Sequence, residues 1–318
     1  MLVDGEWVGD WKPSDGAVKN GSFARPASTF RHWITPDGSP GPTGTGGFQA
    51  EPERYHLYVA LICPWACRTL MARKLKRLED LVPISIVEPA LTDQGWRFGD
   101  YPGSGRDMIN GVVYLHGVYT KADPHFSGRA TIPVLWDKHR QTIVNNESSD
   151  IVRMFNSAFA ALTGDTADLY PADLAEDIDA FNSSIYHTLN NGVYRAGFAQ
   201  SQEAYAEAYE QVFETLDHVE SKLGDNGFVF GERFTESDIR LFVTLIRFDA
   251  AYHGLFKCNR RTVASYPKIS RYVARVLAFD GIRDTVNIDH IKQGYYSIKA
   301  LNPPGIVPIG PDLSFLGL

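Results

Sequence analysis

The apolar pattern of the chain changes near residue 54, where a loop-rich segment gives way to regular elements. Residues 55–61 are mostly aromatic, β-branched or aliphatic and predict a buried strand. Residues 64–78 predict a helix, because apolar side chains recur every three or four positions on one face and basic side chains occupy the other. Residues 83–87 predict a second strand. A strand, a helix and a strand in this order indicate two parallel strands joined by a crossover.

Two further strands are predicted at 131–137 and 141–145, on either side of a short polar turn, and they indicate an antiparallel hairpin. Pro133 lies near the start of the first of these strands. Because proline has no N–H for a sheet, we expect either an edge position or a cis peptide bond there. Residues 147–150, Glu-Ser-Ser-Asp, are typical of a helix start, so a helix is expected at about 151–155.

The apolar spacing becomes helical from about residue 172. Tyr, Val, Phe and Leu residues form a stripe at three- and four-residue steps in one long segment. Thr235 and Asp238 form a capping signal at the start of another apolar helix. The helices expected in this half are 202–223, 235–248 and 267–279. The element order therefore predicts an α/β domain followed by an all-α domain built as a helical bundle.

The remaining segments are rich in glycine and proline and are expected to be irregular. Within the first of them, the glycine-rich stretch 38–47 lacks the Gly-Lys-Ser/Thr ending, the preceding strand and the following helix of a phosphate-binding loop. Residues 88–128 are expected to form a long irregular insert. The predicted organisation is a loop-rich extension at 1–50, an α/β domain at 51–158, a helical domain at 172–300 and a packed tail at 301–318.

Composition excludes several classes of function. The chain has 318 residues and is 44% hydrophobic, which is enough for the cores of two domains. Its net charge is −7 and it has no long basic run, which argues against binding to nucleic acid or to an anionic membrane surface. No apolar run reaches the length of about 18 residues that a spanning helix needs. Because the N-terminus also lacks the pattern of a signal peptide, we expect a cytoplasmic protein.

Cysteine chemistry gives the first indication of activity. Only three cysteines occur, too few for a disulfide framework, and the scattered histidines predict no metal site. Cys63 lies where a strand ends and a helix starts, with Pro64 at the favoured first helical position. The helix dipole favours a nucleophilic thiolate there. Cys67 falls on the apolar helix face and is expected in the core, and Cys258 is interpreted as structural or surface-exposed.

The absence of a close second redox thiol predicts that an external thiol such as glutathione regenerates Cys63. We expect Glu147 to pair with the α-amino group of glutathione and Ser148, at a helix start, to hold its α-carboxylate. The backbone of Ile132, before Pro133, is suited to pair with the cysteinyl residue, and Arg129 with the glycine carboxylate. Tyrosine hydroxyls in the helical half are candidate proton donors, although most buried tyrosines only pack. They are Tyr186, Tyr194, Tyr252, Tyr295 and Tyr296.

Several motifs together resemble those of one family. They are Cys63-Pro-Trp-Ala-Cys-Arg68 and the segments 95–98, 131–137, 146–150, 294–296 and 302–308. This set is similar to the glutathionyl-hydroquinone reductases, the xi class of the cytosolic glutathione transferases, over nearly the whole chain. The resemblance implies an N-terminal thioredoxin-like domain, a C-terminal all-helical domain and a homodimer. It also implies removal of glutathione from glutathionyl-hydroquinones, with glutathione as co-substrate and no metal.

The resemblance also implies roles for particular residues. Cys63 would be the nucleophile and Tyr194 the proton donor. Trp96, Arg129, Ile132, Glu147 and Ser148 would hold glutathione. Tyr252 and one of the adjacent pair Tyr295 and Tyr296 would lie near the aromatic substrate, and the sequence leaves open which of the pair does so.

Two alternatives remain open from the sequence. An omega-type thiol transferase or dehydroascorbate reductase also begins its helix with Cys-Pro, but it needs no tyrosine. A non-catalytic interaction module of the same fold would need neither Cys63 nor the Glu147-Ser148 pair. The sequence does not give the physiological quinone, the order of the first 50 residues or the dimer interface.

Overall fold

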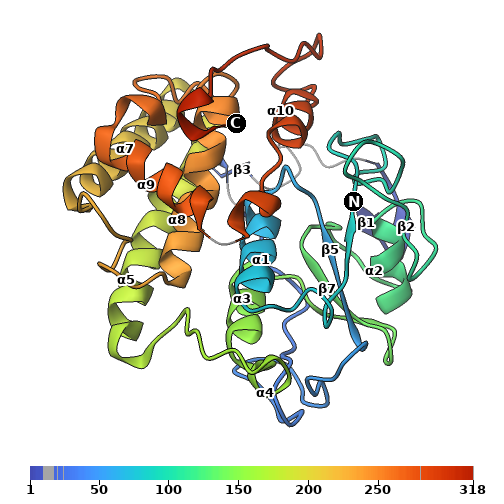
Figure 1. Ribbon diagram of the computed structural model, residues 1–318. Coiled ribbons are helices and arrows are strands. Elements are labelled where there is room, and N and C mark those ends of the chain that lie inside the picture. Colours follow the sequence, from blue (N-terminus) through green and yellow to red (C-terminus); the bar gives the residue numbers. More distant parts are fainter. Residues whose placement is uncertain (10–17, 20, 24, 280, 318) are drawn as a thin grey trace. The chain divides into compact units, whose positions relative to one another are not determined.

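The computed structural model describes residues 1–9, 18–19, 21–23, 25–279 and 281–317 (Figure 1). Its contacts divide the chain into two compact units. The first unit contains Met1–Trp11, Ala27–Asp168 and Thr285–His290, and the second contains Lys12–Pro26, Leu169–Asp284 and Ile291–Leu318. The first unit holds the main sheet and the second is mostly helical, which confirms the predicted fold class of α/β followed by all-α.

A four-stranded mixed sheet in the order β6-β5-β7-β8 forms the centre of the first unit. Its strands are β5 (Tyr55–Val59), β6 (Ile84–Ile86), β7 (Val134–Asp137) and β8 (Thr142–Asn145). β5 pairs with β6 in parallel and with β7 in antiparallel, and β7 pairs with β8 in antiparallel. The predicted parallel pair and the predicted hairpin are therefore confirmed. Pro133 precedes β7 and its bond to Ile132 is cis, which is one of the two arrangements expected for it.

Helices pack on this sheet, with α1 and α3 in contact with each other. The helices of the first unit include α1 (Pro64–Leu75), α2 (His116–Ala122), α3 (Ser148–Ser157) and α4 (Ala160–Thr163). Figure 1 shows α1 and α3 on one side of β5 and β7, and α2 on the other. α1 ends earlier than expected, because Arg77 has a left-handed φ of 54° that a helix cannot continue through.

Two predictions for the first unit need correction. The segment 88–128 is not irregular throughout, since it contains the two-turn helix α2. α3 is also longer at both ends than the predicted 151–155, and it begins at Ser148, directly after its N-cap residue Glu147. The short pair β1 (Leu2–Val3) and β2 (Glu6–Trp7) also belongs to this unit.

The second unit is built from helices of the predicted kind. They include α5 (Ala175–Ile185), α6 (Gly192–Gly197), α7 (Gln202–Lys222), α8 (Glu236–Arg247) and α9 (Pro267–Ala278). The predicted helices at 202–223 and 267–279 are each confirmed to within one residue. α10 (Ile288–Tyr296) begins in the first unit and ends in the second. The short strands β3 (Val18–Lys19) and β4 (Ser22–Phe23) pair in antiparallel.

Two helices of the second unit end in a wider π-helical turn. α5 continues into Tyr186–Asn190, and α8 continues into Phe248–Tyr252, beyond the end that was expected near Phe248. π-helical turns of this kind often occur at functional sites. Short 3₁₀ turns lie in this unit at Ala172–Leu174, Val263–Ser265 and Ser314–Leu316, and another, Ile282–Thr285, ends at the first residue of a first-unit segment.

The start of α8 confirms the capping signal. The backbone N–H of Thr235 donates to the Asp238 carboxylate at 2.9 Å, as a capping box requires. Within the described ranges, no helix combines the length and the apolar character that crossing a membrane requires.

Candidate active site

Cys63 is the N-cap residue of α1 and lies after a tight turn that follows the end of β5 at Val59. Its N–H donates to Ala60 and its carbonyl accepts from the N–H of Cys67, both at 3.0 Å, so its backbone is fixed on both sides. Its side chain is nearly buried, and the S–H contacts the carbonyl of Ile132 at 3.7 Å. The positive end of the α1 helix dipole favours negative charge on this sulfur. The position therefore suits a nucleophilic thiolate.

A buried cation lies on the same helix. Arg68 is only 2% exposed, and its guanidinium lies 4.4 Å from the centre of the Trp65 ring. Its positive charge is one of the causes that lower the pKa of Glu147. Arg68 therefore links α1 electrostatically to the start of α3.

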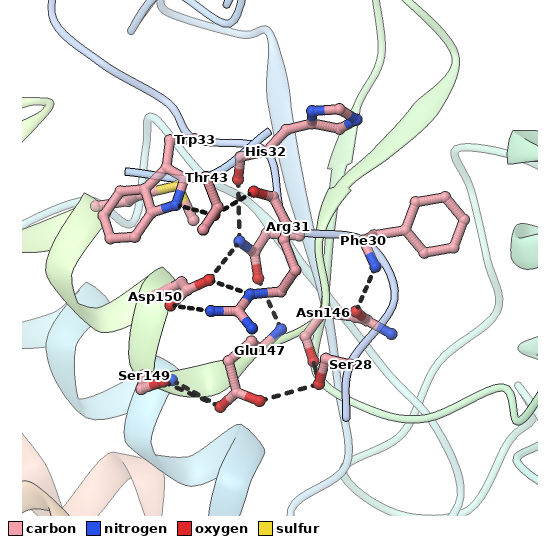
Figure 2. Close-up of polar contacts among 12 residues, drawn as sticks. Ser28, Phe30, Arg31, His32, Trp33, Thr43, Asn146, Glu147, Ser149 and Asp150 are labelled. Carbon is pink, nitrogen blue, oxygen red and sulfur yellow. Dashed lines mark hydrogen bonds and ion pairs between the residues drawn. The ribbon is translucent and has the colours of Figure 1, made fainter. Parts of the chain in front are cut away.

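Glu147 is the N-cap residue of α3, and both of its carboxylate oxygens accept hydrogen bonds (Figure 2). One oxygen accepts from the N–H and the hydroxyl of Ser149, at 3.2 and 3.1 Å, and the other accepts from the hydroxyl of Ser28 at 2.9 Å. Burial by itself would raise the pKa of Glu147. The hydrogen bonds from Ser149 and Ser28, with the charge of Arg68, outweigh burial and lower the pKa. The carboxylate is thus held ionised in a mostly enclosed position.

Ser148 is the first residue of α3 and is 2% exposed. Within the part of the chain that the structure describes, its hydroxyl has no hydrogen-bond partner. An unpaired buried hydroxyl costs about 1–3 kcal/mol, so native proteins seldom keep one without a ligand or a water to satisfy it. Its place at a helix N-terminus suits an anionic ligand group.

Three more residues predicted to hold glutathione lie in the first unit. Ile132 is buried, and its carbonyl accepts the contact from Cys63. Arg129 is half-buried, and its charge partly offsets the effect of burial, which raises the pKa of Tyr119. Trp96 is half-buried and follows the turn 92–95, and its carbonyl accepts from the N–H of Leu115 at 2.9 Å.

A second set of candidate residues lies in the second unit, where three tyrosine hydroxyls form a chain. The hydroxyl of Tyr295 lies 2.5 Å from that of Tyr194 and 2.8 Å from that of Tyr252. Tyr194 comes from α6 and is half-buried, whereas Tyr252 and Tyr295 are buried. Burial is the main cause that raises the pKa of Tyr252 and Tyr295 well above the usual value, against the charge of Arg247. Both phenols therefore stay protonated and available as donors.

Tyr296 points elsewhere. A Cβ atom placed on Gly254 would lie 2.9 Å from the Tyr296 hydroxyl, so that hydroxyl lies beside the 254–255 backbone. The structure thus joins Tyr295, and not its neighbour, to the tyrosine chain. Tyr186, another candidate donor, is 39% exposed.

Comparison with known proteins identifies the family of the chain. Residues 62–158 match the family described as "Glutathione S-transferase, N-terminal domain", and residues 202–275 match "Glutathione S-transferase, C-terminal domain". The chain is 50% identical to "Glutathionyl-hydroquinone reductase YqjG" of Escherichia coli, over 98% of this chain and 95% of that protein. The chain belongs to the glutathionyl-hydroquinone reductases.

Solved structures support the same family, the xi class of glutathione transferases. The glutathione-bound structure of YqjG from Escherichia coli has a TM-score of 0.91 and 47% identity, covering 99% of this chain and 96% of that one. The glutathione-S-transferase Xi from Phanerochaete chrysosporium has a TM-score of 0.88 and 46% identity, covering 92% of this chain and 94% of that one.

In this glutathionyl-hydroquinone reductase, the other two cysteines are buried. Cys67 is fully buried, as expected for a core residue, and its S–H contacts the carbonyl of Thr285 at 3.5 Å. Cys258 is also fully buried, and burial raises the pKa of its thiol to about 12. A thiol protonated over the whole physiological range is not a nucleophile. Among the described residues, no three His, Cys, Asp or Glu side chains gather in a way that could hold a metal ion.

Sequence reasoning missed the contribution of the N-terminal segment to this reductase. Besides Ser28, Arg31 contacts α3, since its guanidinium pairs with Asp150 at 2.5 and 3.0 Å (Figure 2). The N–H of Phe30 also donates to the side chain of Asn146 at 3.1 Å. These residues sit in a loop-rich stretch with no periodicity, and their partners are more than a hundred positions away. No local pattern in the sequence signals such contacts.

Proposed function

We propose that the protein catalyses the glutathione-dependent reduction of glutathionyl-hydroquinones to hydroquinones. The observation that carries this proposal is the hydrogen-bonded chain of Tyr194, Tyr295 and Tyr252. A thiol at a helix start is enough for exchange between sulfur atoms. Cleavage of a carbon–sulfur bond also needs an acid for the carbon, and a phenol supported by two further hydroxyls is suited to that task.

The first step consumes the conjugate. The Cys63 thiolate attacks the glutathione sulfur, and a sulfur–sulfur bond forms as the bond from sulfur to the ring carbon breaks. The electron pair of the broken bond stays on the carbon, which takes the proton of the Tyr194 hydroxyl. The hydroquinone leaves, and Cys63 remains as a mixed disulfide with glutathione. Hydrogen bonding through Tyr295 to Tyr252 stabilises the tyrosinate that this transfer leaves behind.

The second step regenerates the enzyme. The thiolate of a second glutathione attacks the glutathione sulfur of the mixed disulfide, and Cys63 leaves as a thiolate. The product is oxidised glutathione, and the proton lost by the second thiol restores Tyr194. Two glutathione sulfurs are oxidised to one disulfide while the carbon–sulfur bond is reduced to carbon–hydrogen, so electrons and protons balance.

Glutathione binding is proposed to use the γ-glutamyl end of the tripeptide first. The Glu147 carboxylate pairs with the α-amino group, and the Ser148 hydroxyl with the N–H groups at the start of α3 holds the α-carboxylate. The Ser148 hydroxyl, which has no partner among the described residues, supports this assignment, because a ligand carboxylate would satisfy it. Ile132 contributes its backbone to the cysteinyl residue. Arg129 and Trp96 hold the remainder of the ligand.

Tyr252 and Tyr295 are proposed to lie at the aromatic substrate beside Tyr194. Tyr296 was the other candidate for this role, and the direction of its hydroxyl argues against it. We further propose, from the family resemblance and the free cysteines, that the enzyme is a cytoplasmic homodimer. The proposed chemistry requires no metal.

Turnover of a glutathionyl-hydroquinone with glutathione as reductant tests the proposal. We expect the wild-type protein to release the hydroquinone and oxidised glutathione in equal amounts, and Cys63→Ala to lose at least about a thousandfold in rate. Cys67→Ala is the matched control and should keep full turnover. In the absence of the second glutathione, intact mass should show one glutathione bound at Cys63. Full turnover by Cys63→Ala would overturn the scheme.

Tyr194→Phe separates this function from an omega-type thiol transferase. The variant should lose about a hundredfold in carbon–sulfur cleavage but should still reduce a small glutathione mixed disulfide at the wild-type rate, because that exchange involves no carbon. Loss of neither activity would argue for the alternative, because a thiol transferase needs no tyrosine, and equal loss of both would contradict the role of Tyr194 as the acid for the carbon. A non-catalytic interaction module would show neither activity in the wild-type protein and no adduct at Cys63.

A further inference from the structure

A cation from the N-terminal segment, Arg25, lies over the face of the Tyr194 ring. The guanidinium carbon of Arg25 lies 5.0 Å from the centre of the Tyr194 ring and 5.5 Å from that of Phe23. Its Nε–H donates to the side-chain oxygen of Asn191 at 3.2 Å. All of these residues belong to the second unit. Asn191 is buried and precedes α6, so it gives Arg25 a fixed anchor beside the ring.

A cation above an aromatic face is attracted to the electrons of the ring. That attraction becomes stronger when a phenol loses its proton, because the ring and its oxygen then carry a full negative charge. A guanidinium at this distance therefore stabilises tyrosinate more than neutral tyrosine. Arginine suits the position because its planar group can face the ring while its Nε–H keeps the bond to Asn191.

Other residues of the second unit lie around Tyr194 and the hydroxyls bonded to it. The Tyr295 hydroxyl is hydrogen-bonded to the Tyr194 hydroxyl and also to the Tyr252 hydroxyl. The charge of Arg247 acts on both of these tyrosines and opposes the effect of burial on their pKa values. Phe256 packs against the Tyr194 ring edge-on, with ring centres 5.3 Å apart, and adds no charge. Arg25 thus acts on Tyr194, and Arg247 acts on Tyr252 and Tyr295.

We propose that Arg25 is a positioning residue for the carbon–sulfur cleavage step. It holds the ring of Tyr194 in place, and its charge stabilises the tyrosinate that remains after the proton has moved to the ring carbon of the substrate. This inference rests on the proposed function, since it assigns Arg25 a part in the step for which Tyr194 is the acid.

The sign of the effect gives a distinctive signature. Loss of the cation makes the Tyr194 proton harder to give up, so the maximal rate of cleavage falls. The same change also makes Tyr194 lose its proton at a higher pH. The basic limb of the pH–rate profile, where the cleavage rate falls as Tyr194 deprotonates, therefore moves to higher pH. The variant should therefore combine a lower maximal cleavage rate with a basic limb at higher pH. A general disturbance of the structure would lower the rate without moving the pH of the basic limb.

The test compares Arg25→Gln, Arg25→Lys and the wild-type protein in single-turnover cleavage of a glutathionyl-hydroquinone between pH 6 and 11. We expect Arg25→Gln to lose about tenfold in plateau rate and to shift the basic limb upward by about one pH unit. Arg25→Lys should recover part of both effects, because it keeps the charge. In a Tyr194→Phe background, Arg25→Gln should change the rate no further.

The matched control is Arg261→Gln, which removes a guanidinium 3.9 Å from the ring centre of another tyrosine in the same unit, Tyr266. It should leave cleavage and its pH profile unchanged. Reduction of a glutathione mixed disulfide should also be unaffected by Arg25→Gln. An unmoved basic limb in Arg25→Gln, in a protein whose Tyr194→Phe variant is slow, overturns this inference alone. A wild-type protein without cleavage activity overturns the proposed function instead.

Discussion

The hydroxyl oxygens of Tyr194 and Tyr295 lie 2.5 Å apart, although the two residues are 101 positions apart in the chain. Tyr295 is also bonded to Tyr252, so it is the middle member of the chain and needs to donate to one neighbour while accepting from the other. A central hydroxyl of this kind spreads charge along the chain when an end member loses its proton. This relationship gives the first prediction.

Tyr295→Phe should slow carbon–sulfur cleavage by about tenfold to a hundredfold, because the tyrosinate at Tyr194 loses its hydrogen-bond donor. Tyr296→Phe is the matched control, since it removes a hydroxyl from the adjacent position that lies beside Gly254 instead. Steady-state kinetics with a glutathionyl-hydroquinone measure both. Equal rates for the two variants would show that the chain has no part in the reaction.

Ser28→Ala should raise the KM for glutathione by about fivefold to tenfold, because Glu147 loses the hydrogen bond at 2.9 Å that orients one carboxylate oxygen. The substitution should also change how glutathione binding depends on pH. That hydrogen bond is one of the causes that lower the pKa of Glu147, so its loss raises this pKa. Glutathione binding needs the ionised carboxylate. As the pH is lowered, the variant should therefore lose affinity for glutathione at a higher pH than the wild-type protein does.

Calorimetric titration with glutathione between pH 4 and 7 measures this effect. Ser39→Ala is a control from the same N-terminal region, because the hydrogen bond described for the Ser39 hydroxyl is donated to the nearby Asp37 carboxylate, at 2.7 Å. If Ser28→Ala and Ser39→Ala bind glutathione with the same affinity at each pH, the N-terminal segment does not shape the glutathione site.

Ser148→Ala should have opposite effects on stability and on binding. The free protein should gain about 1 kcal/mol in its free energy of unfolding, because the variant removes a buried hydroxyl that has no partner among the described residues. Glutathione affinity should fall by about tenfold, because the ligand carboxylate loses a donor. Urea denaturation with and without saturating glutathione separates the two effects. A less stable free protein that binds glutathione normally would remove Ser148 from the site.

Asp238→Asn should change how stability depends on pH. Burial is the main cause that raises the pKa of Asp238 to about 6, above its usual value of 3.8. The folded state therefore holds this proton more tightly than the unfolded state. The associated stabilisation is full below the usual pKa and is lost as pH rises through about 6.

The asparagine variant has no such proton. Relative to the wild-type protein, Asp238→Asn should become more stable by about 2 kcal/mol between pH 4.5 and pH 7. Urea unfolding of both proteins at the two pH values measures this difference in the free energy of unfolding. The contributions of the other titrating groups are the same in both proteins and cancel. A difference that stays constant with pH would mean that the carboxylate of the capping box is ionised throughout.

The sequence predicts the elements that have strong local signals. The strand at 55–61, the helix after Cys63 and the long helix at 202–223 all appear, because periodicity and capping residues act over a few positions. The helix α2 was missed, because seven residues are too few to establish a helical period. The end of α8 was predicted to within one residue, but the π-helical turn that follows it and carries Tyr252 was missed, since it has no sequence signal of its own.

The candidate site was predicted less completely than the fold. Glu147 and Ser148 were found because they form a recognisable helix start. The choice between Tyr295 and Tyr296 was beyond the sequence, because adjacent residues on a helix differ by about 100° in direction and only packing decides which one faces inward. Ser28 and Arg25 were not identified, since their partners are brought to them by tertiary structure alone.

Segment 25–31 passes from the second unit to the first between Pro26 and Ala27, and it serves both. Arg25 covers the acid in one unit, and Ser28 and Arg31 support the start of α3 in the other. The segment lies outside both regions that match the glutathione S-transferase domains. A single protease cut here, or a chain shortened to the matched regions, would remove a catalytic support and a ligand-binding support in one event, without altering any residue of either core.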